Sequence, residues 1–342
     1  MEQRSDRCFI VAELSCNHMQ RYDLAVETVK AMKTAGADAV KLSIDDPDGG
    51  ITIDSNKECF KISGGTPWDG KTLYQLYKNE TYTPWDWHSR LMKLSSDLGM
   101  IAFSTPSCKK TIDFLESIGN PIYKIASFEI TDIGLVEYAA SKMKPIMIST
   151  GIASLVEIEE AVAVCRKAGN EDITLLKCVS TYPSRLDEIN LKVIPDMRDK
   201  FNVKVGLSDH SLDADVAVAA VALGACVVEK HFILDRKLGG PDAEFSMMPD
   251  EFSKMASAIR STEKALGRID YTVTEHMERS RLFSRSLFVV EDMKKGDIVT
   301  ERNVRSIRPG HGLHPRHLKE ILGKRVLRDL EKGTPFCRSM IN

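Results

Sequence analysis

The chain has little of what marks a disulfide-linked, membrane-spanning or signal-directed protein. Its eight cysteines are scattered over 342 residues, and none belongs to a Cys-x-x-Cys pair. This spacing argues against a disulfide framework or a structural zinc site and favours buried thiols in a reducing compartment. No apolar run approaches the ~20 residues that a membrane-spanning helix needs. Residues 1–7 are polar and lack the apolar core of a signal peptide, so we expect a cytoplasmic protein.

An excess of charge of one sign is also missing. Lysine and arginine number 47 against 49 aspartates and glutamates, which gives a net charge of −2. A protein that binds nucleic acid through a basic face carries a clear positive excess, so no nucleic-acid partner is expected. The length of 342 residues accommodates a barrel of roughly 250 residues and a small second domain.

Eight short, apolar, β-branched runs are present, and helix-like segments separate them. The runs occupy 8–14, 39–44, 100–106, 122–127, 145–151, 173–180, 203–210 and 226–232. The helix-like segments include 23–37, 84–99, 154–169 and 249–267. Continuous apolar strands that alternate with helices are typical of a parallel sheet. Eight such units predict a (β/α)₈ TIM barrel over residues 1–267.

The pattern changes after residue 267. Residues 268–284 are polar and predict a linker that contains at most a short helix. Residues 285–342 consist of short β-like pieces with turns and predict a small β-rich domain. Within it, 292–296 (DMKKG) recurs as 329–333 (DLEKG), which suggests internal pseudo-symmetry.

One connection in the predicted barrel is unusually long. Between residues 44 and 84 no clear element is visible, and the segment contains Trp68, Tyr74, Tyr77 and Tyr82. A long loop in a compact fold is typically a lid or a binding loop. Because it follows the second strand, it should lie on the catalytic face. A decorative insertion is the alternative.

Lysines and hydroxyls gather where the predicted strands end, the place where TIM barrels carry their active sites. Lys41 and Lys124 interrupt apolar strands, with Lys177 and Lys230 at comparable positions. The hydroxyls are those of Thr105, Ser127, Ser149 and Ser208. Such groups predict a cradle for a phosphate and a carboxylate, because lysine serves phosphate well as a point charge. The alternative is that each lysine snorkels or pairs with an acid on a neighbouring strand.

His210 and His231 end strands seven and eight, which adjoin in a barrel. Neutral imidazoles are the commonest metal ligands, so this pair predicts a metal with open positions for a substrate oxygen. Asp209 and Glu229 are nearby acids that could orient the rings. Histidines that act as acid, base or substrate ligand without a metal are the alternative.

Carboxylates complete the inventory of the catalytic face. Glu13 ends the first strand, with Asn17 and His18 just beyond it, and Glu129 follows Ser127. We expect Glu13 to act as a general base or to hold a sugar hydroxyl. His18 could equally cap the following helix.

At this point the motifs resemble a known family, the sialic acid synthases. The matching segments are 12–18 (AELSCNH), 103–106 (FSTP), 123–129 (YKIASFE), 149–151 (STG), 180–183 (STYP), 206–210 (GLSDH) and 229–232 (EKHF). The tail, with Arg308-Pro309-Gly310 and Gly323-Lys324, is similar to the family's C-terminal antifreeze-like (SAF) domain. Segments 64–77 and 83–88 resemble the pseudaminic branch. Ser180, where N-acetylneuraminate synthases carry Asn, favours the same branch.

The resemblance implies a reaction. Phosphoenolpyruvate would condense with an open-chain acetamido sugar and release phosphate, giving a nine-carbon 2-keto acid. The pseudaminic branch implies 2,4-diacetamido-2,4,6-trideoxy-L-altrose as the sugar. The neuraminate and legionaminic branches, with N-acetylmannosamine or a 2,4-diacetamido-6-deoxy-mannose, stay open as alternatives. A divalent metal ion held by His210 and His231 is implied, Mn²⁺ first and Mg²⁺ or Co²⁺ as alternatives.

The resemblance also implies roles for single residues. Phosphoenolpyruvate would be held by Lys41, Thr105, Lys124, Ser127, Ser149, Ser180 and Ser208. The sugar would be held by Glu13, Asn17, His18, Glu129, Tyr182, Asp242 and Arg308. The catalytic residues would be Glu13, Lys124, His210 and His231. Arg308 would reach a sugar bound in the other subunit, so a domain-exchanged homodimer is expected.

Two rival functions remain. An aldolase on the same barrel could use Lys124 as a Schiff-base nucleophile. A binding protein on a degenerate barrel is the second rival, and the joint presence of lysines, hydroxyls and both histidines argues against it.

Overall fold

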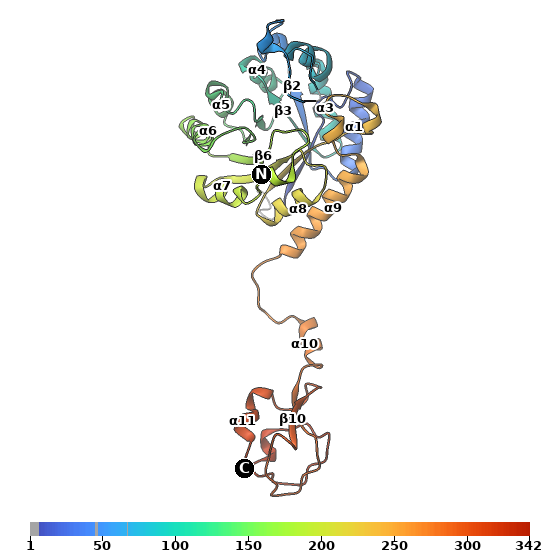
Figure 1. Cartoon of the computed structure of the whole chain (residues 1–342), viewed down its shortest axis with the longest axis vertical. Helices are drawn as coiled ribbons and strands as arrows, with labels where there is room; N and C mark the ends of the chain where they lie inside the picture. The colour runs from blue at the N-terminus through green and yellow to red at the C-terminus, as the bar shows by residue number, and fades with distance from the viewer. Residues whose placement is uncertain (1–6, 45–46, 67) are drawn as a thin grey trace. The chain divides into compact units, whose positions relative to one another are not determined.

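The computed structural model describes residues 7–44, 47–66 and 68–342, and the chain divides into two compact units, Met1–Gly267 and Arg268–Asn342. The first unit is a closed barrel of eight parallel strands in sequence order, with β1 paired to both β2 and β8 (Figure 1). The predicted (β/α)₈ TIM barrel is therefore confirmed. The strands are β1 (Phe9–Glu13), β2 (Ala39–Ile44), β3 (Ile101–Pro106), β4 (Tyr123–Ile125), β5 (Ile146–Ser149), β6 (Ile173–Cys178), β7 (Lys204–Asp209) and β8 (Val227–His231).

Helices follow the strands on the outside of the barrel (Figure 1). They are α1 (Tyr22–Thr34), α3 (Trp85–Asp97), α4 (Lys109–Ser117), α5 (Ile133–Ala140), α6 (Leu155–Lys167), α7 (Val193–Phe201), α8 (Asp215–Ala222) and α9 (Pro249–Leu266). Local sequence fixes their ends. Ser154 and Glu157 form a capping box at the start of α6, and Gly169, with φ +88°, follows its end.

The barrel interior is layered, and the layers position the site. Seven apolar side chains pack together inside the barrel toward its N-terminal end: Val11, Ala39, Phe103, Ile122, Met147, Leu176 and Val227. Two residues further along each of these chain segments stand Glu13, Lys41, Thr105, Lys124, Ser149, Cys178 and Glu229. Because side chains alternate between the two faces of a strand, a step of two keeps the polar set in the same interior. An apolar floor thus carries a polar layer that lies at the C-terminal end.

Gly206 on β7 completes this apolar layer without a side chain. A Cβ at Gly206 would lie 2.6 Å from the Val227 carbonyl oxygen and 2.7 Å from Leu176 Cδ2. A larger residue would push β8 away from β7, so glycine lets the two strands close over the floor.

The long connection from β2 to α3 is not devoid of structure, contrary to expectation. It contains short helical turns at Pro47–Gly49 and Glu58–Phe60, the short helix α2 (Leu73–Leu76) and a π-helical turn at Tyr77–Thr81. Thr72 and Gln75 form a capping box that starts α2. The sequence pattern misses these pieces because each is only three to five residues long.

The second unit contains α10 (Glu275–Arg281), an antiparallel pair of β9 (Ser286–Val289) and β10 (Val304–Ile307), and α11 (Leu318–Ile321). Its own core includes Leu287, Val289 and Phe336. The unit is thus a small domain with β structure and a core of its own, and α10 is the short helix expected in the linker.

The repeated pentapeptides of this unit face each other. Met293 and Leu330 exchange two backbone hydrogen bonds of 2.8 Å. Asp292 Oδ1 accepts from the Lys332 N–H at 2.7 Å, and Asp329 Oδ1 accepts from the Lys295 N–H at 2.8 Å. The sequence repeat therefore corresponds to a local pseudo-twofold relation.

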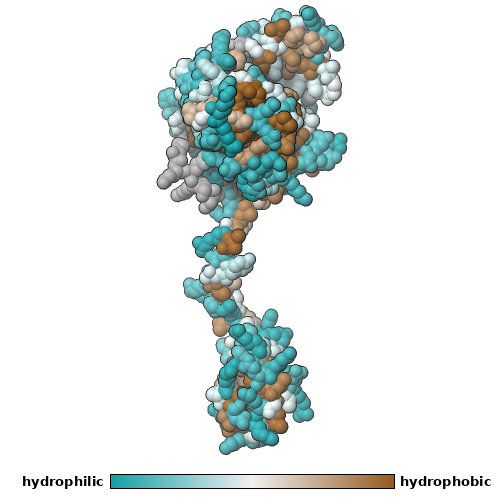
Figure 2. All heavy atoms as spheres, turned by 90° about the vertical axis from the view of Figure 1, so that its left-hand side faces the viewer, coloured by the Kyte–Doolittle hydropathy of each residue, from teal (hydrophilic) through white to brown (hydrophobic). Residues whose placement is uncertain are grey.

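The surfaces of both units are mixed in character. Figure 2 shows polar residues interspersed with apolar ones over the visible face of each unit. Within the described part of the chain, no helix has the length and apolar character that crossing a bilayer requires.

Candidate active site

A cavity of about 190 Å³ lies at the C-terminal end of the barrel. Twelve of the residues expected from the sequence line it: Glu13, Lys41, Thr105, Lys124, Ser127, Glu129, Ser149, Tyr182, Ser208, His210, His231 and Asp242. The strands bring these residues together from positions more than two hundred residues apart in the chain.

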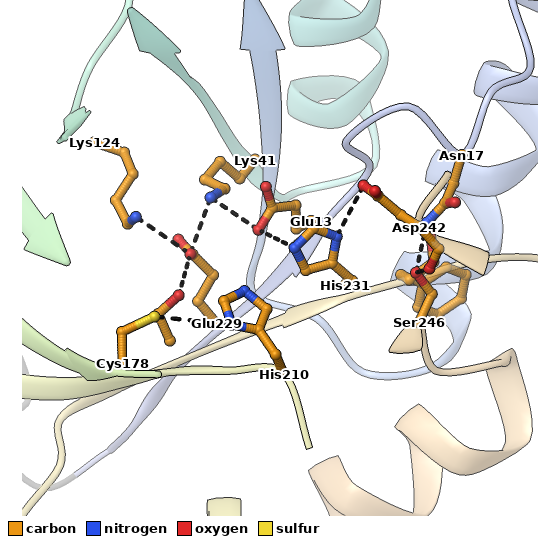
Figure 3. Close-up of polar contacts among 12 residues, drawn as sticks. Glu13, Asn17, Lys41, Lys124, Cys178, His210, Glu229, His231, Asp242 and Ser246 are labelled. Carbon is orange, nitrogen blue, oxygen red and sulfur yellow. Dashed lines mark hydrogen bonds and ion pairs between the residues drawn. The ribbon is translucent and has the colours of Figure 1, made fainter. Parts of the chain in front are cut away.

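Charged side chains form a continuous line across this cavity (Figure 3). Lys41 Nζ lies 2.8 Å from Glu13 Oε2 and 2.9 Å from Glu229 Oε1. Lys124 Nζ lies 3.4 Å from the same Glu229 oxygen. At the other end, His231 Nε2 is 3.3 Å from Glu13 Oε2. The pairing with an acid of a neighbouring strand, left open by the sequence, is therefore present for Lys41 and Glu13, whereas Glu229 reaches both lysines across the barrel interior. Both lysines still line the cavity.

Lys41 and Lys124 differ in the direction in which their pKa is shifted. Burial lowers the pKa of Lys41, but Glu13 and Glu229 more than offset this, and its pKa is raised. Burial also lowers the pKa of Lys124, and the weaker attraction of Glu229 leaves it below the usual value. The pKa of Glu229 falls to about 2 because Lys124 and Lys41 outweigh its burial. Of the two lysines, Lys124 is therefore the one whose charge is less fully compensated by carboxylates.

Several polar atoms around the lysines lack a partner. Thr105 Oγ1, Ser149 Oγ and Glu229 Oε2 are buried without a hydrogen bond. An unsatisfied buried polar group costs about 1–3 kcal/mol. The two hydroxyls therefore stand ready for acceptor atoms of a ligand, next to the cations that an anion needs.

Gly151 holds the hydroxyls of the next strand ends close together. Its N–H donates to Ser127 Oγ at 3.0 Å. A Cβ at this position would lie 2.2 Å from Ser180 Oγ and 2.7 Å from Ser127 Oγ. Ser180, expected in the site, thus lies beside Ser127 although it is not among the residues that line the cavity.

His210 and His231 face each other with ring centroids 5.3 Å apart. His210 Nδ1 is 3.0 Å from the Val179 carbonyl oxygen. His231 Nδ1 is 3.4 Å from Asp242 Oδ2, but poor alignment leaves this nitrogen without a hydrogen bond. An unsatisfied buried nitrogen opposite a second imidazole suits a metal ion. In the ranges that the structure describes, no three His, Cys, Asp or Glu side chains gather as a ligand set, so an ion would need oxygen ligands from water or substrate.

The two acids that we expected to orient the imidazoles, Asp209 and Glu229, have lysines as partners instead. Asp209 pairs with Lys230 at 2.6 Å, and Glu229 serves the two lysines. Neither acid bonds directly to an imidazole, so the expectation that Asp209 and Glu229 orient the rings by direct contact is wrong. The period of two explains the error for Asp209, because its side chain points out of the barrel while those of Ser208 and His210 point in.

Asn17 and His18 lie outside the residues that line the cavity. Asn17 Nδ2 donates to the Phe232 carbonyl at 2.9 Å and to Ser246 Oγ at 2.8 Å, which ties the loop after β1 to the loop after β8 (Figure 3). His18 Nε2 is 2.9 Å from Thr83 Oγ1, and burial lowers its pKa to about 4. His18 is thus a neutral, buried residue that anchors the end of the long connection.

The long connection supplies part of the cavity wall. Trp68 and Tyr77 line the cavity, and Trp68 Nε1 donates to the Pro241 carbonyl at 3.3 Å. The Trp68 ring lies 5.8 Å from that of Tyr182. Tyr74 instead donates to Asp48 at 3.0 Å and does not line the cavity. The segment therefore lies where a lid would lie, at the wall of the cavity. Only some of its aromatic residues face the site.

Cys178 and Phe245 are cavity residues that the sequence interpretation missed. Cys178 Sγ lies 3.8 Å from His210 Nδ1. Burial alone would raise the pKa of this thiol, but His210, Ser127 and Lys124 lower it to about 6. The available signal was its spacing of two from the interior-facing Leu176. Phe245, on the loop after β8, had no such signal.

Arg308 belongs to the second unit and follows β10. It lines a surface groove of about 540 Å³ in that unit together with residues of α10 and the turn after it, including His276, Arg281 and Phe283.

Fold and cavity together define a (β/α)₈-barrel protein whose C-terminal face suits a small anionic ligand. The chain belongs to the NeuB family: the model of that family matches residues 28–271, and the model of the SAF domain matches residues 284–342.

Individual relatives agree. The pseudaminic acid synthase of Campylobacter jejuni subsp. jejuni serotype O:23/36 is 44% identical over 97% of this chain and 96% of its own. The N,N'-diacetyllegionaminic acid synthase of Legionella pneumophila is 35% identical over 96% of this chain and 92% of its own. The crystal structure of N-acetylneuraminic acid synthetase from Leptospira borgpetersenii, in complex with citrate, has a TM-score of 0.70 at 30% identity and covers 81% of this chain and 90% of that one.

Proposed function

We propose that this chain is a pseudaminic acid synthase. It condenses phosphoenolpyruvate with 2,4-diacetamido-2,4,6-trideoxy-L-altrose, forms a nine-carbon 2-keto acid and releases phosphate. The observation that carries this proposal is the 44% identity to a pseudaminic acid synthase over nearly the whole chain, against 35% for a legionaminic acid synthase. The legionaminic reaction is therefore the alternative.

Phosphoenolpyruvate is assigned to the lysine end of the cavity. Lys124 and Lys41 supply cations, and the partnerless hydroxyls of Thr105 and Ser149 supply donors. Ser127, Ser180 and Ser208 complete the set. Ser208 at present donates to Glu229 Oε1 at 3.0 Å, so it and the lysines exchange a carboxylate partner for the ligand. Charge-assisted hydrogen bonds of this kind are the strong ones in a buried site.

The charges of the cavity support a divalent cation at the two histidines. Lys41 and Lys124 face four carboxylates in the lining, those of Glu13, Glu129, Glu229 and Asp242. A multiply charged anion enters such a cavity at a high electrostatic cost unless a cation accompanies it. His210 and His231 would hold the ion, with Mn²⁺ first and Mg²⁺ or Co²⁺ as alternatives. Such an ion supplies a Lewis acid for the sugar aldehyde.

The sugar is assigned to the histidine end. Glu13, Glu129, Tyr182 and Asp242 offer acceptors and one phenol for its hydroxyl and amide groups. Burial raises the pKa of Glu129, so this carboxyl holds a proton more readily than usual. Asn17 and His18 act on the sugar only through the loops that they hold.

In the reaction, C3 of phosphoenolpyruvate bonds to C1 of the sugar, the aldehyde oxygen takes a proton, and water adds at C2 before phosphate leaves. We assign a proton transfer to Glu13, and the contacts of its Oε2 with both Lys41 and His231 support this assignment. Lys124 neutralises charge on the departing phosphate.

We further propose a domain-exchanged homodimer in which Arg308 acts in trans. Large apolar side chains are exposed on loops after β4 to β8, among them Phe128, Ile152, Leu186 and Leu212. The second unit exposes its own, including Phe283 at 72%. Charge adds complementarity: residues 285–342 carry thirteen lysines and arginines against seven acids, whereas residues 1–284 carry 34 against 42.

The test of function is a panel assay. Purified protein, phosphoenolpyruvate and Mn²⁺ are incubated with each of the three candidate sugars, and phosphate release and product mass are measured. We expect the 2,4-diacetamido-2,4,6-trideoxy-L-altrose reaction to be the fastest. A wide preference for N-acetylmannosamine would move the protein to the neuraminate branch. Borohydride added with substrate should trap no adduct on Lys124, whereas a Schiff-base aldolase gives one.

The phosphoenolpyruvate cradle makes a separate prediction. Lys41→Met and Lys124→Met each remove a cation and should weaken phosphoenolpyruvate binding at least about tenfold, measured by calorimetry. Lys177→Met is the matched control, because Lys177 Nζ donates to the Cys178 carbonyl at 2.9 Å and does not line the cavity. Unchanged affinity in both cradle variants would remove this assignment.

A further inference from the structure

A buried ion pair lies outside the barrel interior between the two strands that carry the histidines. Asp209 ends β7, Lys230 precedes the last residue of β8, and the two are direct partners in the strand register. Lys230 is 0% exposed and Asp209 3% exposed. Neither residue lines the active-site cavity. The pair is therefore not part of the ligand-binding surface.

The pair belongs to a small closed network. Lys230 Nζ lies 2.6 Å from Asp209 Oδ2, and it also donates to the carbonyl and, at 3.2 Å, to the hydroxyl of Ser211. The Ser211 N–H donates to Asp209 Oδ1 at 2.9 Å, and its hydroxyl donates to Asp209 Oδ2 at 3.1 Å. The residues on both sides of His210 are thus tied to the residue just before His231.

This network restrains the backbone positions of His210 and His231 relative to each other. Each ring lies inside the barrel, because adjacent residues of a strand point to opposite faces. Outside it, both neighbours of His210 and the residue before His231 are fastened to one another. A metal ion held by two imidazoles depends on their separation, and groups that orient ligands tune metal affinity. A buried ion pair is weak evidence for stability, since apolar residues of similar size often replace it without loss. Its closed geometry is better explained by positioning.

We infer that Asp209, Lys230 and Ser211 form a clasp that sets the spacing of His210 and His231 for a divalent cation. They are positioning residues that never touch substrate or metal. The inference rests on the proposed function, since it assumes the metal assigned there to the two histidines.

The test uses full-length protein and a readout independent of turnover. Mn²⁺ binding is measured by electron paramagnetic resonance without substrates, phosphoenolpyruvate binding by calorimetry at saturating Mn²⁺, and stability by the urea midpoint. The informative variant is Asp209→Asn/Lys230→Met, which removes both charges and leaves no unpaired ion. We expect Mn²⁺ affinity to fall about ten- to a hundredfold, with phosphoenolpyruvate affinity within twofold of wild type.

The matched control is Lys204→Met. Lys204, at the start of β7, pairs with Asp172 at 2.8 Å, but both side chains are exposed by more than 40%. This variant removes a β7 lysine pair at the opposite end of the strand and should leave Mn²⁺ affinity unchanged. If the double variant does not fold, Ser211→Ala takes its place, because it removes one hydroxyl from the clasp and should weaken Mn²⁺ several-fold.

The outcomes separate the two proposals. Wild-type Mn²⁺ affinity in a folded double variant, or in a folded Ser211→Ala, overturns the clasp and leaves the metal assignment intact. Absence of Mn²⁺ binding in the wild type overturns the metal assignment and the clasp together, while the sugar panel still decides the synthase reaction. A loss of phosphoenolpyruvate affinity equal to that of Mn²⁺ would show general disruption rather than positioning.

Discussion

Gly151 illustrates how a missing side chain organises polar ones. Gly151→Ala puts a methyl group within about 3 Å of the Ser127 and Ser180 hydroxyls and of Cys178 Sγ, where real contacts do not occur. The hydroxyls must therefore leave their present positions, which we assign to phosphoenolpyruvate binding. We expect phosphoenolpyruvate affinity to fall at least about tenfold with little change in the circular dichroism spectrum.

Gly134→Ala serves as the control for this substitution. Gly134 lies in α5, and a Cβ there meets only Asp132 Oδ1 at an ordinary 3.5 Å. Affinity equal to wild type in Gly151→Ala would mean that the serines of these strand ends do not hold the ligand.

Two buried histidines should make stability depend on pH. Burial lowers the pKa of His18 and of His88 to about 4, from 6.5 in an exposed histidine. The unfolded chain therefore takes up protons as the pH falls below 6.5, while the folded barrel resists until about pH 4. The free energy of unfolding should fall over this window, by up to ~3 kcal/mol per histidine.

Urea midpoints between pH 7 and pH 4.5 measure this effect. His88→Gln removes one of the two titrating groups and should flatten the profile. An identical slope in wild type and His88→Gln would contradict the assignment. The sequence gives no warning of this role, because His88 stands in an ordinary amphipathic helix pattern.

For single residues, the sequence predicts which side chains face the barrel interior. It predicts the contact partners of those side chains less well. Lys41, Lys124 and Ser149 follow from their positions at or near the ends of predicted strands. The partners of Lys41 do not, because Glu229 comes from a strand 188 residues away in the chain, and its closeness depends on the closing of the barrel. Asn17 and His18 follow the first strand at the right end, yet a turn sends their side chains into loop contacts.

At the scale of elements, the β2–α3 lid contributes an aromatic wall. The ring of Trp68 neighbours that of Tyr182, and Tyr182 lies 4.4 Å from His210 and 4.9 Å from Phe245. An apolar wall favours a methyl group over a hydroxymethyl group at C6 of the sugar. Trp68→Ala should reduce the kcat/KM preference for the 6-deoxy sugar over its 6-hydroxy analogue by about tenfold, since small apolar contacts are worth 10–200-fold.

Tyr74→Phe is the control from the same lid. Its lost hydroxyl bonds to Asp48 and its ring does not line the cavity, so the preference should stay at the wild-type value. If Tyr74→Phe and Trp68→Ala shift the preference equally, the lid acts by its mobility and not by the Trp68 ring. Strands and long helices of this fold were predictable because their periodicity extends over many residues. The lid was not, because its turns are short and rest on contacts with distant loops.

For the whole molecule, the assembly proposal predicts complementation. Arg308→Ala and His210→Ala proteins should each be inactive. When they are mixed and allowed to exchange subunits, part of the activity should return, because one site of the mixed dimer joins an intact barrel to an intact second unit. Phosphate release measures the recovery.

Mass spectrometry of differently tagged subunits confirms exchange in the same samples. Exchange without recovered activity would show that Arg308 does not act in trans. The sequence resemblance alone suggested this arrangement. Composition could not, because a net charge of −2 hides an acidic first part and a basic tail.

The pairing of β1 with β8 has a consequence for how the protein is made. Phe9–Glu13 leaves the ribosome early, but its partner Val227–His231 emerges about 220 residues later. At 5–20 residues per second, β1 waits on the order of 10–40 s with one open edge. An exposed, apolar strand edge invites pairing with other chains. Nascent chains that end before residue 227 should therefore be the aggregation-prone species during synthesis, and slowing translation across residues 13–227 should lower the soluble yield.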